Sequence, residues 1–167
     1  MRSLRPPAKL TTLDTFAPER ERLREQSLRL VLTNGCFDLL HPGHVSFLQQ
    51  ARALGDRLVV ALNSDSSVRA LKGPSRPIYN ETERAFALAA LSCVDHLVLF
   101  STPHLVAEIR MLGPEVYTKA GDYTLDTLHA REREALQEIG ARIVFLPFLA
   151  GYSTSNLLRR IQNAKSS

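Results

Sequence analysis

Short apolar runs recur along the chain, and segments of helical length separate them. Unbroken runs at residues 30–32, 58–62, 97–100 and 143–146, with a weaker one at 116–117, are typical of parallel strands covered on both faces. Strands that alternate with crossovers of this length predict an α/β fold, because right-handed crossovers leave few topologies. We therefore expect a Rossmann-like, doubly wound parallel sheet with helices on both faces.

Local signals predict where several helices begin. Asn80 followed by Glu83 resembles a capping box, and Thr102 before Pro103 suits another helix start. The last helix should begin near Ser153.

The chain has the length of one domain. Its 167 residues are 44% hydrophobic and 23% charged, which is the composition of an ordinary globular protein with a sizeable core. We expect residues 1–17 to be a flexible tail that leads into a short charged helix beginning near Pro18. Residues 18–167 should form a single domain, without an internal repeat or a linker.

The charge balance favours small anionic partners. Twenty-one Lys and Arg against 17 Asp and Glu give a net charge of +4, the basic residues are scattered, and only 7% of residues are aromatic. This pattern does not indicate a nucleic-acid groove, but it suits phosphorylated small molecules. No apolar stretch approaches the roughly 18 residues of a membrane span, and the first ten residues lack the apolar core of a secretory signal. With two cysteines that lack paired spacing, we expect a soluble, cytoplasmic protein.

The stretch TNGCFDLLHPGH, residues 33–44, carries the candidate chemistry. It joins the first apolar run to a segment with helical spacing, so it is a strand-to-helix turn. Pro42 suits the first helical position, Gly43 lets a ligand approach the backbone, and free amides at the positive helix end favour an anion. His41 and His44 can both be aimed into the space above the helix terminus. Two imidazoles at an anion site indicate phosphoryl chemistry.

Two simpler interpretations compete with this one. Pro and Gly are common at helix starts for purely structural reasons, and a His there is often only a cap or a surface residue. The spacing of His41 and His44 also suits zinc, but no cluster of Cys, His or acidic residues supplies a third ligand, and Cys36 and Cys93 stand alone. We therefore expect no protein-bound metal.

The whole stretch resembles the signature of the cytidylyltransferase-like nucleotidyltransferases, in which a Gly-x-Phe-Asp turn precedes His-x-Gly-His. Within that superfamily the chain is most similar to the heptose 1-phosphate adenylyltransferases. Four strings match that family over about residues 30–161: TNGCFDLLHPGH, ALNSDSSVRALKGPSRPI, KAGDY and GYSTS. Ala120 and Ser155 depart from it, where the family usually has Gly and Thr. The chain looks like the stand-alone form, without the sugar-kinase domain that is sometimes fused ahead of this module.

The resemblance implies five parallel strands in the order 3-2-1-4-5, with the signature after the first strand. In such sheets ligands bind beyond the carboxyl ends of the strands, where the strand order reverses. Polar segments follow every expected strand, at residues 33–44, 63–65, 101–102, 119–123 and 151–155. We expect them to converge on one edge of the sheet.

The resemblance also implies roles for residues in these segments and in the loop that follows the second strand. His41, His44 and Lys72 are expected to be catalytic, because they would stabilise negative charge on the reacting phosphates. The residues expected to bind the nucleotide are Thr33, Asn34, Gly35, Cys36, Phe37, Gly43, Lys119, Gly121, Asp122, Tyr152, Ser153 and Thr154. Those expected to hold the sugar phosphate are Asp38, Asn63, Asp65 and Arg84.

Several of these residues have a plainer interpretation. Lys72 and Arg84 suit a solvated loop, as charged residues usually do. Ser153 and Thr154 can cap the final helix and do nothing else. Asp38 is either structural or holds a substrate hydroxyl.

The implied reaction converts ATP and a heptose 1-phosphate into ADP-heptose and pyrophosphate, with Mg²⁺ carried by the ATP phosphates. We expect direct in-line attack by the sugar phosphate, because this substrate already supplies a competent oxygen nucleophile. A glycerol-3-phosphate cytidylyltransferase that uses CTP and a nucleotide-binding regulatory module without turnover are the alternatives. The choice of adenine over cytosine rests on the resemblance alone, which also implies a homodimer.

Overall fold

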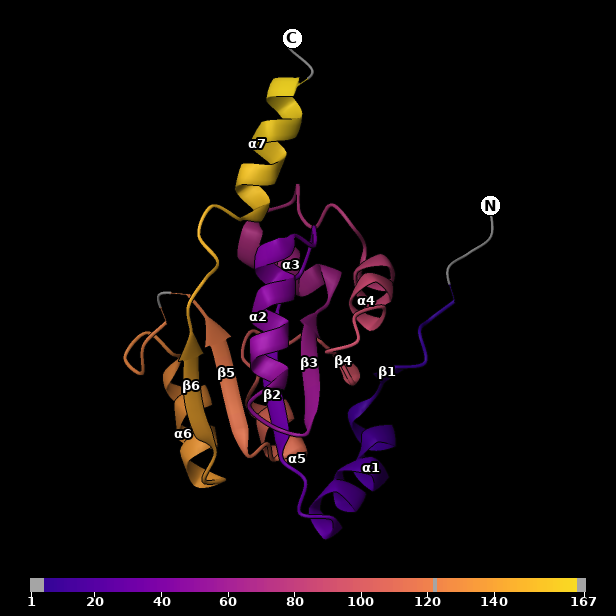
Figure 1. Cartoon of the computed structure of the whole chain (residues 1–167), viewed down its shortest axis with the longest axis vertical. Coiled ribbons are helices and arrows are strands. Elements are labelled where there is room, and N and C mark those ends of the chain that lie inside the picture. Colours follow the sequence, from indigo (N-terminus) through magenta and orange to yellow (C-terminus); the bar gives the residue numbers. More distant parts are fainter. Residues whose placement is uncertain (1–4, 122, 165–167) are drawn as a thin grey trace.

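A parallel sheet forms the centre of the fold (Figure 1). Within residues 5–121 and 123–164, which the computed structural model describes, the sheet has six strands in the order β1-β4-β3-β2-β5-β6. The strands are β1 (Leu10–Thr11), β2 (Leu30–Gly35), β3 (Arg57–Asn63), β4 (His96–Phe100), β5 (Val116–Ala120) and β6 (Arg142–Leu146). Neighbouring strands are parallel throughout, so all of them end at the same edge.

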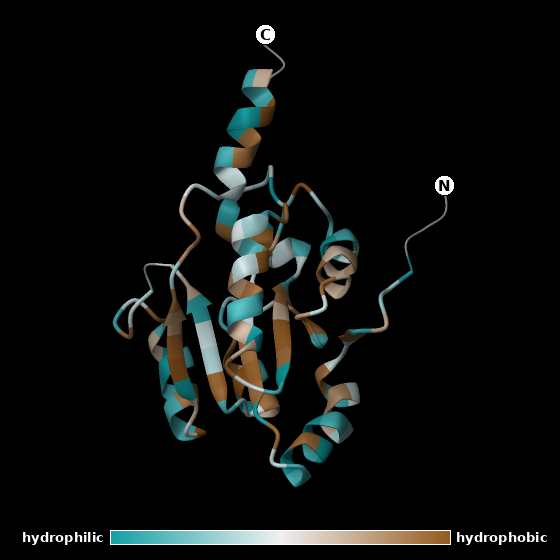
Figure 2. Cartoon of the chain, in the orientation of Figure 1, coloured by the Kyte–Doolittle hydropathy of each residue, from teal (hydrophilic) through white to brown (hydrophobic). Residues whose placement is uncertain are grey.

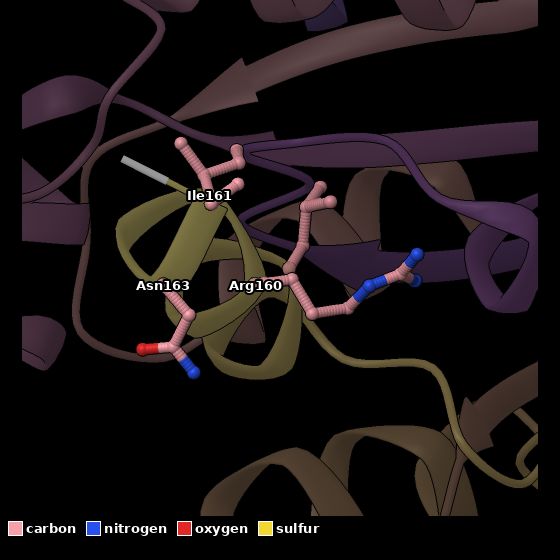
Figure 3. Close-up of a pocket in the computed structure, with 5 residues that line it drawn as sticks. Arg160, Ile161 and Asn163 are labelled. Carbon is pink, nitrogen blue, oxygen red and sulfur yellow. The ribbon is translucent and has the colours of Figure 1, made fainter. Parts of the chain in front are cut away.

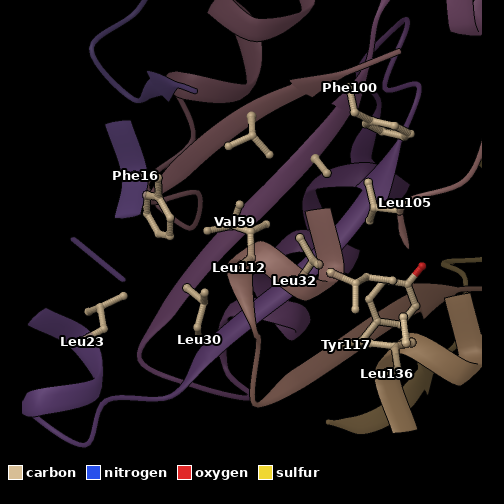
Figure 4. Close-up of a cluster of buried hydrophobic side chains, with 14 of the residues drawn as sticks. Phe16, Leu23, Leu30, Leu32, Val59, Phe100, Leu105, Leu112, Tyr117 and Leu136 are labelled. Atoms are coloured by element: carbon tan, nitrogen blue, oxygen red, sulfur yellow. The ribbon is translucent and has the colours of Figure 1, made fainter. Parts of the chain in front are cut away.

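Helices cover both faces of this sheet, and the last helix of the chain extends away from it (Figure 1). They are α1 (Leu13–Glu25), α2 (Pro42–Arg52), α3 (Asp65–Lys72), α4 (Glu81–Ala89), α5 (Val106–Leu112), α6 (Ala130–Glu138) and α7 (Thr154–Ala164). One buried apolar cluster joins the sheet to α1, α5 and α6 (Figure 4), and a second joins it to α2 and α4. Leu30 and Leu32 belong to the first cluster and Val31 to the second, as the alternation of a strand requires. The expected α/β architecture with two helical layers is confirmed.

The hydropathy of the ribbon explains why these layers form. In Figure 2, β3 and β6 are apolar along most of their length, whereas the helices carry both apolar and polar residues. Residues 58–61 of β3 are fully buried, because side chains on both faces of this strand pack under a helical layer. The apolar runs of the sequence therefore became the strands.

The expected number of strands was wrong. The sheet has six strands rather than five in the order 3-2-1-4-5, because β1 is added beside β4, where Leu10 pairs with Leu97 and Thr11 with Val98. The five expected strands keep their relative order within the larger sheet, as β4-β3-β2-β5-β6. The turn at residues 36–41, between β2 and α2, therefore lies at the point where the strand order reverses.

Part of the segment that we expected to be a tail belongs to the fold. The helix predicted to begin near Pro18 begins at Leu13, with Thr12 as its cap, and Pro18 lies inside it. Phe16 is 2% exposed and packs in the cluster shown in Figure 4. Thr12 and Thr15 form a capping box at this start, so the helix begins at a local cap and buries Phe16 in the core.

Two of the other helix starts agree with their local signals, and one does not. The capping box of α4 is confirmed, with Asn80 N–H donating to Glu83 at 2.9 Å and Glu83 N–H donating to Asn80 at 3.0 Å. α7 begins at Thr154, next to the predicted Ser153. The start predicted at Thr102 was wrong, because α5 begins at Val106 and the amide just before it donates to the carboxylate of Glu132.

α7 extends from the body of the protein (Figure 1) and has no buried residue among those described. No helix within residues 5–121 and 123–164 is both long and apolar enough to cross a bilayer.

Candidate functional site

The turn between β2 and α2 has the predicted strand-to-helix geometry. His41 is the N-cap of α2 in an extended conformation, and Pro42 occupies the first helical position. The Nδ1 atom of His41 accepts the amide N–H of His44 at 3.3 Å. Because His41 uses its own side chain as the cap, its ring is held over the first turn of the helix, where the positive end of the helix dipole favours an anion.

The two histidines are brought together with two other rings. His41 and His44 stack with centroids 3.8 Å apart and planes at 19°. Phe37 lies against His44 at 5.3 Å, and Tyr152, from the loop before α7, lies nearly parallel to His41 at 6.5 Å. A Cβ at Gly43 would come within 3.0 Å of the His41 ring and 3.1 Å of Tyr152 Cβ, so glycine allows this close packing. Residues far apart in sequence thus meet above the start of α2.

Burial favours the neutral form of both imidazoles in the free protein. Burial and then the neighbouring His41 ring lower the pKa of His44 from 6.5 to about 4, and the carbonyl of Leu39 offsets little of this. Burial also lowers the pKa of His41. A bound anion would raise these pKa values and so favour the imidazolium form.

The residues between β2 and these rings form a tight corner. Phe37 has a positive φ of 43°, which is strained for a residue with a side chain. Its ring covers Gly35, where a Cβ would lie 2.9 Å from it. The Thr33 hydroxyl is buried and has no hydrogen-bond partner among the described residues. Glycine at position 35 is thus needed for the corner that sets Phe37 against His44.

The carboxyl end of β5 supplies a second group of expected nucleotide residues. The Tyr117 hydroxyl donates to Asn34 at 2.8 Å, which fixes the amide of Asn34 at the end of β2. The Lys119 ammonium lies 5.1 Å from the centre of the Tyr123 ring, and burial lowers the pKa of Lys119. We had not singled out Tyr117, because an aromatic residue inside a strand usually signals packing alone.

Gly121 has a positive φ of 96°, and a Cβ there would lie 2.1 Å from the ring of Phe148. The backbone turn after β5 therefore requires glycine at this position. Asp122, which we also expected to bind nucleotide, lies outside the described residues.

The loop after β6 ends in a helix cap. The Ser153 hydroxyl accepts the amide N–H of Asn156 at 3.1 Å, so the predicted cap of α7 is confirmed. Thr154 is the first residue of α7 and is partly buried. Tyr152 is 43% exposed.

Most of the residues expected to hold the sugar phosphate form hydrogen bonds with other groups of the protein. Arg84 is fully buried, and its guanidinium donates to the Cys36 carbonyl at 2.6 Å, the Tyr79 carbonyl at 3.0 Å and Asp65 at 2.7 Å. A buried guanidinium with these partners braces the turn from beneath, and the expected substrate contact of Arg84 stays a prediction. Asn63 donates to Ser67 at 2.9 Å and is also buried.

Asp38 is likewise held inside the protein. Its side chain is 1% exposed and accepts from Arg76 at 2.6 Å, from the Ile78 amide at 2.9 Å and from the Tyr79 amide at 3.0 Å. The structural alternative for Asp38 is therefore the one that its geometry supports. It ties the β2–α2 turn to the loop at residues 73–80.

Lys72, at the end of α3, is exposed. Within residues 5–121 and 123–164 its ammonium has no ion pair or hydrogen bond. Burial raises the pKa of the Cys36 thiol, and the charge of Lys72 is the first of the influences that oppose this shift. Lys72 thus brings a positive charge to the β2–α2 turn without a protein anion to neutralise it.

Among the described residues no group of three or more His, Cys, Asp or Glu is placed to hold a metal. A surface depression (Figure 3) lies along α7 and contains none of the expected site residues; it is lined by Leu157, Arg160, Ile161, Asn163 and Ala164. The β2–α2 turn and its neighbours therefore remain the candidate site.

Two solved structures share this fold. The lipopolysaccharide core biosynthesis protein from Thermoplasma volcanium GSS1 superposes with a TM-score of 0.60 at 24% identity, over 73% of this chain and 97% of that one. Pantoate-beta-alanine ligase from Francisella tularensis, complexed with beta-gamma ATP and beta-alanine, gives 0.59 at 13% identity, over 92% of this chain and 78% of that one.

Sequence comparison identifies the family. Bifunctional protein HldE of Citrifermentans bemidjiense is 46% identical over 154 residues, which cover 92% of this chain and 31% of that protein. The protein of the same name from Geobacter sulfurreducens is 46% identical over 157 residues, 94% of this chain and 32% of that one. The chain thus spans about a third of the length of these relatives. The Cytidylyltransferase-like family profile matches residues 32–160, and the chain belongs to this family.

Proposed function

We propose that this protein is a nucleotidyltransferase that transfers AMP from ATP to a heptose 1-phosphate, giving ADP-heptose and pyrophosphate. Family membership supports the reaction class, and the similarity to bifunctional protein HldE supports the motif-based choice of a heptose phosphate. The observation that carries the proposal is the stacked pair of His41 and His44 at the start of α2, with the unpaired charge of Lys72 beside the same turn.

The two substrates fit on opposite sides of this turn. Lys119 lies near the carboxyl end of β5 and Tyr152 follows β6, and both strands lie on one side of β2, whereas Lys72 follows β3, which lies on the other side. The nucleotide would occupy the first side and the sugar phosphate the second. An oxygen of the sugar phosphate then attacks the α-phosphorus of ATP, a new P–O bond forms, and the bond to the bridging oxygen breaks to release pyrophosphate.

The histidines would stabilise the leaving pyrophosphate. Nδ1 of His41 accepts the His44 amide, so the proton of its neutral ring lies on Nε2, which is left to donate to a phosphate oxygen. A triphosphate would also raise the pKa of both rings, because a nearby anion favours the charged form. Proton uptake would thus accompany nucleotide binding, and Lys72 would reduce the repulsion between the two phosphates.

Mg²⁺ would enter with the ATP phosphates, since the described side chains form no metal-binding cluster. When bound there, it supplies additional neutralisation of the triphosphate charge. A homodimer and a cytoplasmic location remain predictions from the sequence.

The test is to incubate the protein with Mg²⁺ and either ATP or CTP, adding heptose 1-phosphate or glycerol 3-phosphate, and to follow pyrophosphate. We expect pyrophosphate release only in the mixture of ATP and heptose 1-phosphate. Turnover only with CTP and glycerol 3-phosphate would make the protein the cytidylyltransferase instead. Tight nucleotide binding without pyrophosphate in any mixture would indicate the regulatory module.

A further inference from the structure

Three basic residues, Lys72, Arg76 and Arg84, surround the loop at residues 73–80, and the structure uses them differently. Arg84 is fully buried, and its Nε, Nη1 and Nη2 atoms each donate a hydrogen bond to a protein acceptor. Arg76 makes one ion pair, through Nε to Asp38, and its side chain is 18% exposed. Within residues 5–121 and 123–164, its two Nη groups have no hydrogen-bond partner. Arg76 therefore keeps donors that the protein does not satisfy.

Asp38 holds the Arg76 guanidinium in a defined orientation. The carboxylate is itself fixed by the amides of Ile78 and Tyr79, at 2.9 and 3.0 Å, and is almost completely buried. The bond from Arg76 Nε to this carboxylate is 2.6 Å long. Because a guanidinium is planar, fixing Nε directs its Nη groups away from Asp38 as a fork suited to an anion.

The Arg76 guanidinium lies on the side of the site where the acceptor substrate is expected to bind. The charges of Lys72 and Arg76 both act on the Cys36 thiol, so both cations lie near the corner after β2. They come from the chain that follows β3, whereas the expected nucleotide residues Lys119 and Tyr152 lie near the carboxyl end of β5 and after β6. Two cations with free donors thus flank the β2–α2 turn on the side away from the nucleotide.

We propose that Arg76, oriented by Asp38, binds the phosphate of the acceptor substrate together with Lys72. This inference rests on the proposed nucleotidyl transfer and assigns its acceptor subsite. It replaces the substrate role expected of Arg84 with a bracing role and makes Asp38 a positioning residue. An acceptor without a phosphate would leave the Lys72 ammonium and the Nη groups of Arg76 without an anion and should not bind.

The test compares Arg76→Gln and Arg76→Lys with the wild type in the pyrophosphate assay, varying heptose 1-phosphate and ATP separately. Arg76→Gln should raise the KM for heptose 1-phosphate about ten-fold or more, because a charge-assisted hydrogen bond is lost, with the KM for ATP changed less than about two-fold. Arg76→Lys should recover part of this loss, since it keeps the charge without the fork. Arg69→Gln is the control, because it removes an exposed charge one turn before Lys72 and should change neither constant.

The outcomes separate this inference from the proposed function. If the wild type does not turn over, the proposed function fails, whereas an active wild type with an unchanged acceptor KM in Arg76→Gln refutes the inference alone. A rise in the KM for ATP only would place Arg76 on the nucleotide instead. Equal losses for both substrates, accompanied by a lower melting temperature and no rescue by Arg76→Lys, would show that Arg76 only supports the loop.

Discussion

The depressed pKa of His44 should make the protein less stable in mild acid. The folded protein holds this pKa at about 4, against 6.5 in the unfolded chain, so below about pH 6.5 the unfolded state binds the proton first. The contribution of His44 is complete above about pH 6.5 and is lost as the pH falls toward about 4. At 1.36 kcal/mol per pKa unit, the loss is about 2 kcal/mol near pH 5 and about 3 kcal/mol near pH 4.

The substitution His44→Gln isolates the contribution of His44 to the free energy of unfolding, because it removes the titrating ring. Urea unfolding of both proteins, at intervals from about pH 7.5 to about pH 4.5, gives their free energies of unfolding. Carboxylates lower both curves in acid, so only the difference between the two proteins reports on His44. The variant should be the less stable protein at neutral pH, because it loses ring packing. The difference in free energy of unfolding between the two proteins should become smaller as the pH falls.

His41→Gln provides the matched comparison. Burial lowers the pKa of His41 as well, whereas the pKa of His44 is lowered by burial and by the neighbouring ring. The difference in free energy of unfolding between the wild type and His41→Gln should therefore change less with pH. Parallel curves for the wild type and His44→Gln across this range would refute the reasoning, because they would show that the ring titrates alike in both states.

The other predictions concern the reaction. Lys72→Ala should lower kcat by about 100-fold or more with an unchanged melting temperature, since an exposed, unpaired ammonium contributes little to stability; near-normal turnover in steady-state assays would remove it from the site. Replacing Ser153 and Thr154 together by Ala should weaken ATP binding in calorimetry and cost about 1 kcal/mol of stability, as the cap is lost; an unchanged affinity would leave only the cap. ATP binding should take up protons near neutral pH, seen as a buffer-dependent heat. Enzyme mixed in equal amount with α-labelled ATP and Mg²⁺, without sugar phosphate, should show no pyrophosphate burst and no label on denatured protein; a burst abolished by His41→Ala or His44→Ala would make that residue a nucleophile.

The sequence by itself determined the features that depend on near neighbours. The β2–α2 turn follows from an apolar strand, Pro42 at the first helical position and a cap at His41, all within one short stretch. The capping box of Asn80 and the cap at Ser153 each involve an amide three residues away. Such contacts form wherever the local conformation permits them, so spacing along the chain is enough to find them.

Only the tertiary structure decided the features whose partners lie far away. β1 is two residues long and exists because Leu10 pairs with Leu97, and no periodicity can mark so short a strand. Arg76 and Asp38 are separated by 38 positions, and Arg84 and Cys36 by 48. In the sequence both arginines are charged residues in or next to one loop between two helices. Whether such a residue is buried as a brace or left with free donors depends on which distant acceptors the fold brings to it, and that choice is not encoded in local spacing.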